Sequence, residues 1–229
     1  MSKTIIVAGY GVGISDGVAR RFGKEGFKVA LVSRNAEKVA QAARALSDEK
    51  IEAKGFAVDL GDPAAVTKLV ADVRSSLGPV TVLHWNAYTL GAGDLLTADL
   101  TELRKLFDIS VTSLVAAVQA SLPDLKAQGK DAAVLVTGGG FAFYDPNIDT
   151  IATQYSAMGV AISKAAQHKT VGVLHQKLKG EGVYVGEVVV TGSVKGTAFD
   201  QGNANLTGDQ VAERFWQMYT QRHEATTNI

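Results

Sequence analysis

The sequence lacks cysteine altogether and has only four histidines among its 229 residues. The missing cysteine excludes disulfides, thiolate nucleophiles and cysteine-liganded zinc sites together. The four histidines are scattered along the chain, without the short spacing that metal ligands share. We therefore expect neither a disulfide framework nor a metal ion, so any catalysis must use other groups.

An excess of charge of one sign is lacking too. Lysine and arginine number 23, and aspartate and glutamate also number 23, so the net charge is zero. Bulk electrostatics therefore gives no reason to expect a nucleic acid or an anionic membrane as partner, and a small-molecule substrate is favoured. No apolar run approaches the roughly 20 residues of a membrane span, and the first residues lead directly into a strand. These absences predict a cytoplasmic protein.

What the chain does contain is a regular alternation of apolar runs and helical segments. Runs of strand length occupy residues 4–7, 27–33, 51–58, 80–85, 132–137 and 183–190, with a short edge strand expected at 225–229. Helices are expected near residues 16–23, 36–49, 63–77, 100–128, 154–179 and 207–221. The segment between residues 140 and 154 is expected to be a loop.

Apolar strands that alternate with helices require a parallel sheet covered on both faces. We therefore predict an α/β fold, a doubly wound parallel sheet (Rossmann fold) of six or seven strands with helices on both faces. The length suits one domain that spans residues 1–229. In such a fold the ligand binds at the carboxyl ends of the strands.

A glycine-rich turn follows the first apolar run. Gly9, Gly11 and Gly13 lie between this run and a helical segment that starts near Asp16. Glycines in such a turn allow the backbone to approach a pyrophosphate, and the N-terminus of the next helix favours the anion. A glycine cluster also fits an ordinary tight turn, so the rest of the chain must decide.

In order and spacing the whole chain resembles the short-chain dehydrogenase/reductase superfamily. That family's cofactor motif is Thr-Gly-x-x-x-Gly-Ile-Gly, which Gly9, Gly13 and Ile14 match while Ala8 and Ser15 depart from it. The resemblance continues at the carboxyl ends of later strands, at Asp59, Leu60, Asn86 and Gly192. It implies that Asp59 and Leu60 lie near the adenine and Gly192 beside the nicotinamide. It further implies a homo-oligomer, a dimer or a tetramer.

The choice between NAD and NADP depends on the end of the second strand. An acidic residue at this place would bind the ribose hydroxyls of NAD, but here Ser33 stands there and Arg34 follows. A hydroxyl and a guanidinium both hydrogen-bond to a 2′-phosphate, which a carboxylate would repel. We therefore predict NADP rather than NAD. The alternative is that Arg34 is simply a solvated residue before a helix.

The catalytic residues are where the resemblance weakens. The family uses a Tyr-x-x-x-Lys pair on one helix, and Lys164 matches the lysine while Val160 stands at the tyrosine. Tyr155 begins a Tyr-Ser-Ala sequence, yet it can serve Lys164 only from a loop before the helix. The family's asparagine, which supports the lysine, falls on Ser110, and its serine falls on Gly138 or Gly139. The predicted catalytic residues are Lys164, Tyr155 and Ser110, and Tyr144 and Tyr88 are further candidate proton donors.

Together these features predict an NADP(H)-dependent oxidoreductase acting on a small carbonyl or alcohol, from a divergent branch without the family tyrosine. Hydride transfer depends chiefly on the cofactor and its orientation, so another group could supply the proton. The alternative from another class is a non-catalytic NADP(H)-binding sensor or scaffold. A relative in fold alone, with non-redox chemistry, is the third reading.

Overall fold

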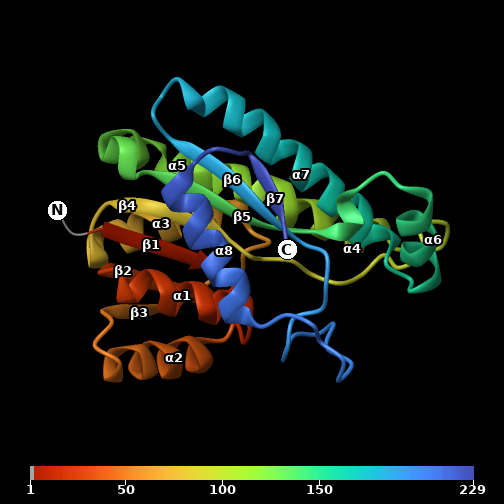
Figure 1. Cartoon of the computed structure of the whole chain (residues 1–229), viewed down its shortest axis with the longest axis horizontal. Coiled ribbons are helices and arrows are strands. Elements are labelled where there is room, and N and C mark those ends of the chain that lie inside the picture. Colours follow the sequence, from red (N-terminus) through yellow and green to blue (C-terminus); the bar gives the residue numbers. More distant parts are fainter. Residues whose placement is uncertain (1–2) are drawn as a thin grey trace.

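The computed structural model describes residues 3–229, which form seven parallel strands in a single sheet. The strands are β1 (Lys3–Ala8), β2 (Phe27–Ser33), β3 (Ala53–Ala57), β4 (Val80–Trp85), β5 (Ala133–Gly139), β6 (Tyr184–Val190) and β7 (Thr226–Asn228). Their order is β3-β2-β1-β4-β5-β6-β7 (Figure 1). The order reverses between β1 and β4, which leaves a crevice at their carboxyl ends. The predicted doubly wound sheet is confirmed.

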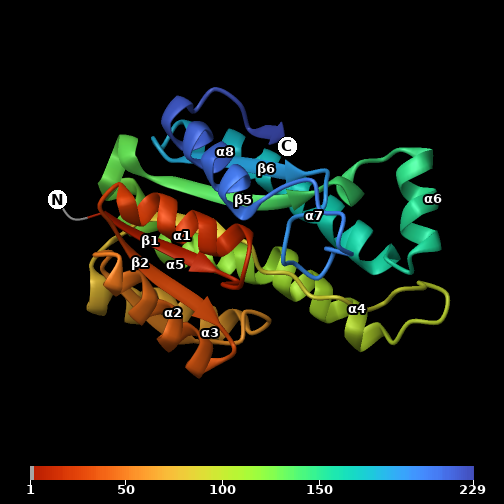
Figure 2. The ribbon, with the colours of Figure 1, turned by 60° about the horizontal axis from the view of Figure 1, so that its bottom comes forward.

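Helices cover both faces of the sheet, as Figure 1 and Figure 2 show. One layer contains α1 (Ile14–Lys24), α2 (Ala36–Asp48) and α8 (Gly208–Gln221). The opposite layer contains α3 (Pro63–Leu77), α5 (Ser113–Gln128) and α7 (Met158–Lys179). Each layer packs an apolar core against the alternating side chains of the strands, which explains why the strands are apolar along both faces.

Between β5 and α7, where the sequence predicts a loop, the structure has a helix. It is α6 (Pro146–Gln154), and it follows the short 3₁₀ turn η3 (Gly140–Ala142). The Asp145 carboxylate caps α6 by accepting from the backbone N–H groups of Asn147 and Ile148. The chain then breaks and α7 begins at Met158, so the expected helix from residue 154 starts four residues late.

The long helix expected over residues 100–128 is an unbroken helical run with a change of pitch. It consists of α4 (Leu100–Phe107), the π-helical turn η1 (Asp108–Thr112) and α5, followed by the 3₁₀ turn η2 (Gly129–Asp131). By its length, and by a mean hydropathy of 1.4 over an 18-residue window, this run could cross a membrane. Its apolar side chains instead pack on the sheet and on α3, because it is a core helix of the fold. Figure 2 shows α4 and α6 extending past the carboxyl ends of the strands.

Candidate active site

A cavity of about 1000 Å³ lies at the carboxyl ends of the strands. It is lined by the segments after β1, β2, β3, β4, β5 and β6 and by one side of α7. The structure brings most of the predicted site residues together in its wall: Gly9, Gly11, Ile14, Ser33, Arg34, Asp59, Leu60, Asn86, Lys164 and Gly192. Gly13 is not in the wall but packs closely against it, because a Cβ there would lie 3.0 Å from the Thr197 side chain.

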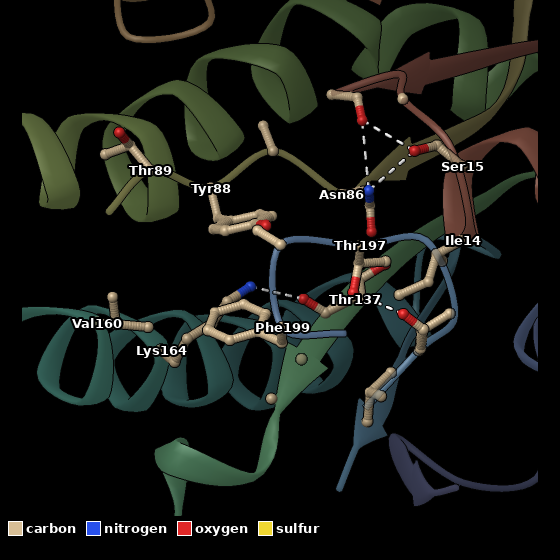
Figure 3. A pocket seen from close by; sticks show the side chains of 18 of the residues that line it. Ile14, Ser15, Asn86, Tyr88, Thr89, Thr137, Val160, Lys164, Thr197 and Phe199 are labelled. Carbon is tan, nitrogen blue, oxygen red and sulfur yellow. Dashed lines mark hydrogen bonds between the residues drawn. The ribbon is translucent and has the colours of Figure 1, made fainter. Parts of the chain in front are cut away.

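The glycine turn after β1 is locked to the end of β4. Gly9 has a φ of 84°, and its N–H donates to the Val32 carbonyl at 3.1 Å. The Ser15 hydroxyl donates to the Gly9 carbonyl at 2.9 Å, and the Asn86 amide donates to the Ser15 hydroxyl at 2.9 Å (Figure 3). Ser15 stands at the family's third glycine, and here it ties the turn to Asn86. The turn is therefore a rigid surface next to the N-terminus of α1.

At the end of β2, the cavity wall contains an exposed positively charged residue, Arg34. Arg34 is exposed at the end of β2, and within residues 3–229 no salt bridge engages its guanidinium. Next to it, Asn35 caps α2 by accepting from the Lys38 N–H at 2.9 Å. Asp59 turns back to accept from the Gly61 N–H at 2.9 Å, which holds its carboxylate close to its own backbone. This end suits an anion beside the Arg34 guanidinium.

Lys164 lies in the cavity wall with its ammonium held by two acceptors. Its Nζ donates to the Thr137 carbonyl and to the Gln167 Oε1, each at 2.8 Å. Burial lowers the pKa of Lys164 to about 8, and the nearby charge of Glu187 opposes that shift. The Gln167 amide donates in turn to the backbone carbonyl of Ser110 at 3.1 Å. Sequence reasoning did not find Gln167, which makes the link between Ser110 and the lysine.

Ser110 does not line the cavity, and its carbonyl is the group that the network uses. It is a buried residue of η1, the π-helical turn that packs against α7. The structure therefore connects Ser110 to Lys164, but through its backbone and through Gln167.

Removal of Gln167 is expected to destabilise the fold. Gln167→Leu leaves the Ser110 carbonyl without its donor and Lys164 without one of its acceptors. Each lost partner of a buried polar group costs about 1–3 kcal/mol, so the free energy of unfolding should fall by about 2 kcal/mol or more. Urea denaturation measures the change. Gln41→Leu on the exposed side of α2 is the matched control, and an equal effect of both changes would contradict the network.

A second residue that sequence reasoning missed is Glu187, in the middle of β6. Its side chain is 0% exposed, and one oxygen, Oε2, accepts from the His168 Nδ1 on α7. The other oxygen, Oε1, has no hydrogen-bond partner among residues 3–229 and faces Gly138, where an added Cβ would lie 2.5 Å away. Burial raises the pKa of Glu187, while His168 and Lys164 oppose the rise. The available signal was a single acidic residue inside the apolar run 183–190.

The tyrosines are distributed differently from the sequence expectation. Tyr155 lies outside the cavity and is 69% exposed, because α6 ends at Gln154 and the break before α7 turns this residue to solvent. Tyr144 is 99% exposed. Tyr88 does line the cavity, stacked on Phe199 with ring centroids 6.0 Å apart. Figure 3 shows Val160 and Lys164 projecting from the same side of α7.

A parallel, doubly wound sheet with a glycine turn after β1 places the protein in the dinucleotide-binding Rossmann class. The family model for short chain dehydrogenases matches residues 3–206. The chain therefore belongs to the short-chain dehydrogenase family.

Two relatives illustrate the range of the family around this chain. It is 32% identical over 149 residues to the meso-2,3-butanediol dehydrogenase of Serratia marcescens, which covers 62% of this chain and 59% of that enzyme. It is 28% identical over 200 residues to the 2-(S)-hydroxypropyl-CoM dehydrogenase 3 of Xanthobacter autotrophicus. This match covers 87% of this chain and 74% of that enzyme.

Solved structures agree with the fold. A short chain dehydrogenase of Burkholderia cenocepacia in complex with NADP superposes with a TM-score of 0.86 at 23% identity, covering 99% of this chain and 96% of that one. The L-sorbose reductase of Gluconobacter frateurii, complexed with NADPH and L-sorbose, superposes with a TM-score of 0.83 at 19% identity. The match covers 100% of this chain and 95% of that one.

Proposed function

We propose that the protein is an NADP(H)-dependent oxidoreductase that interconverts a small carbonyl compound and its alcohol. The observation that carries this proposal is one continuous cavity with the glycine turn and Arg34 at one end and Lys164 at the other. The relatives named above are dehydrogenases, and the two structural neighbours are described in complex with NADP or NADPH. A reduced nicotinamide cofactor, when bound, supplies the hydride.

The residues of the cavity fit such a cofactor. We assign the pyrophosphate to the turn of Gly9, Gly11 and Gly13 with Ile14 at the helix start, where free N–H groups and the helix dipole favour an anion. The 2′-phosphate is assigned to Ser33 and Arg34. The adenine is assigned to Asp59 and Leu60, and the nicotinamide end to Asn86, Gly192 and Lys164. These assignments follow the family resemblance.

The proposed enzyme departs from the family at the residue that would act as the general acid. Val160 stands four residues before Lys164, at the family's tyrosine, and both residues line the cavity. The family's serine position falls on Gly138 or Gly139, whose lack of side chains leaves no hydroxyl there. We place the protein in a divergent branch that works without the tyrosine. By the same resemblance we expect a homodimer or homotetramer, which sedimentation measures.

The test is a panel of aldehydes and ketones incubated with the protein and NADPH. Loss of absorbance at the nicotinamide band reports turnover, and a parallel titration of protein fluorescence reports cofactor binding. Turnover of a member of the panel supports the proposal. Binding without turnover across the whole panel contradicts it and favours the sensor or scaffold.

Arg34→Ala is expected to remove most of the preference for NADPH over NADH. A charge-assisted hydrogen bond contributes about 1.5–3 kcal/mol, which corresponds to roughly ten- to a hundredfold in affinity. Dissociation constants for both cofactors measure the effect, and NADH affinity should hardly change. Arg44→Ala on the exposed side of α2 removes the same charge outside the cavity and is the control. Equal affinities of the unmodified protein for NADPH and NADH would exclude the assignment.

A further inference from the structure

The cavity needs a proton donor near its nicotinamide end, and the side chains there are few. Val160 has no proton to give, and Tyr155 and Tyr144 lie outside the cavity. An ammonium group has three N–H donors. Lys164 uses two of them on the Thr137 carbonyl and on Gln167, which leaves one N–H uncommitted. Lys164 is 9% exposed and lines the cavity, so the cavity is the space in which this N–H can meet an acceptor.

A buried carboxylate lies directly behind the lysine. Lys164 holds the carbonyl of Thr137, and the unpartnered Oε1 of Glu187 faces the next residue, Gly138. No salt bridge within residues 3–229 joins Glu187 to Lys164, so the carboxylate acts on the ammonium by its charge across the peptide bond between Thr137 and Gly138. In a buried region such a charge is screened far less than at the surface.

His168 holds this carboxylate in place. His168 lies on α7 one helical turn after Lys164. Its Nδ1 bonds to the Oε2 of Glu187, and its ring packs edge-on against Phe143. A buried carboxylate with one free oxygen is costly unless nearby positive charge or donors support it. Lys164 and His168 give that support, and in return Glu187 favours the charged lysine.

We propose that Lys164 itself is the proton donor of this site, and that Glu187, held by His168, is the positioning residue that keeps the lysine charged. The inference rests on the proposed function and names its acid. As the carbonyl carbon receives the hydride supplied by the reduced nicotinamide cofactor, a lysine N–H bond breaks and an O–H bond forms at the carbonyl oxygen. The lysine is left neutral, and it regains a proton from water when the alcohol leaves.

The other charged groups around Lys164 are accounted for. β6 contributes Glu187, α7 contributes His168, and η1, which packs against α7, contributes Asp108. Of these groups, Glu187 is the one whose charge acts on the lysine. Arg34 and Asp59 belong to the opposite end of the cavity, at the ends of β2 and β3. A change of pH that affects the lysine should therefore depend on Glu187.

The first experiment uses the protein without cofactor or substrate. Lysine labelled with ¹³C at Cε is titrated by NMR, with Lys164→Arg to assign the signal and the exposed Lys169 as an internal reference. The unmodified protein should give a Lys164 midpoint near a pKa of about 8. Glu187→Gln should lower that midpoint by about one unit, the effect of removing a nearby buried opposite charge. His168→Asn should lower it by less.

Glu181→Gln is the matched control. It removes the same charge at an exposed position bonded to Lys126, in the turn between α7 and β6, and should leave the Lys164 midpoint unchanged. A midpoint that does not move in Glu187→Gln overturns the proposal, and this result does not depend on any turnover.

The second experiment follows kcat for carbonyl reduction against pH. A lysine acid predicts that kcat falls as the pH rises through the Lys164 midpoint, and that Glu187→Gln shifts this fall down by the same amount as in the NMR titration. Tyr88→Phe tests the rival donor, and a lysine acid predicts that the fall in kcat keeps its midpoint on the pH scale in this variant. If Tyr88→Phe instead removes the pH dependence together with most of the turnover, Tyr88 is the donor and the proposal is overturned. Absence of any turnover refutes the proposed function and the donor role, while the NMR titration still decides whether Glu187 controls the lysine.

Discussion

Gly9→Ala should cost the protein both stability and its cofactor. At φ 84° an alanine is strained by about 1–2 kcal/mol, because its Cβ crowds the backbone. The new Cβ would also lie 2.6 Å from the N and Cα of Ala87, which are backbone atoms without freedom to turn away. Relief requires the end of β4 to separate from the turn, which breaks the bonds of Asn86 to Ser15 and Gly9.

We expect the strain and the overlap together to lower the free energy of unfolding by about 3 kcal/mol, or roughly 6–12 °C in melting temperature. Affinity for NADPH should fall at least tenfold, because the surface that faces the pyrophosphate moves. Differential scanning calorimetry and a fluorescence titration measure the two effects.

Gly11→Ala is the matched control for this change. Gly11 belongs to the same turn and the same cavity wall, but its φ is not positive and an added Cβ meets no atom within 4 Å. The variant should melt near the unmodified protein. If both variants lose the same stability, the loss reflects mobility of glycine turns in general, and the close approach of Gly9 to Ala87 is not its cause.

Sequence patterns predicted the sheet, and they named residues that the fold gathers in the wall of one cavity, because both depend on local rules. Apolar runs of strand length and glycines before a helix need no knowledge of distant partners. The same rule was available for α6, where Asp145 and Pro146 repeat the start signal of Asp62 and Pro63 at α3. The expected helix from residue 154 instead covers the end of α6 and all of α7, and Tyr155 lies at the break between the two helices.

The network behind Lys164 could not be predicted in the same way. Gln167 and Glu187 acquire their roles from contacts between α7, η1 and β6, segments that are far apart in the sequence. An apolar strand with one glutamate signals a buried charge, but which partner compensates that charge depends on how α7 lies over the sheet. Tertiary packing decides such pairs, and local patterns do not encode it.

Lys164→Met is expected to lower kcat by about 10²–10⁴-fold, which is roughly the contribution of a general acid. Methionine fills a similar volume without a proton to donate and without the positive charge at the proposed nicotinamide end of the cavity. Affinity for NADPH should therefore weaken as well, so turnover must be compared at saturating cofactor. The loss in kcat then reports the proton, and the loss in affinity reports the contact with the cofactor.

This variant should also lose stability, so turnover must be compared at a temperature at which it is fully folded. The Thr137 carbonyl and Gln167 lose a buried donor, which should lower the free energy of unfolding by about 1–3 kcal/mol. Glu187 then loses its positive neighbour, so its pKa should rise further. Lys169→Met, on the exposed side of α7, is the control. A Lys164→Met enzyme that keeps its kcat would show that the proton comes from Tyr88 or from water, and that the lysine contributes to cofactor binding alone.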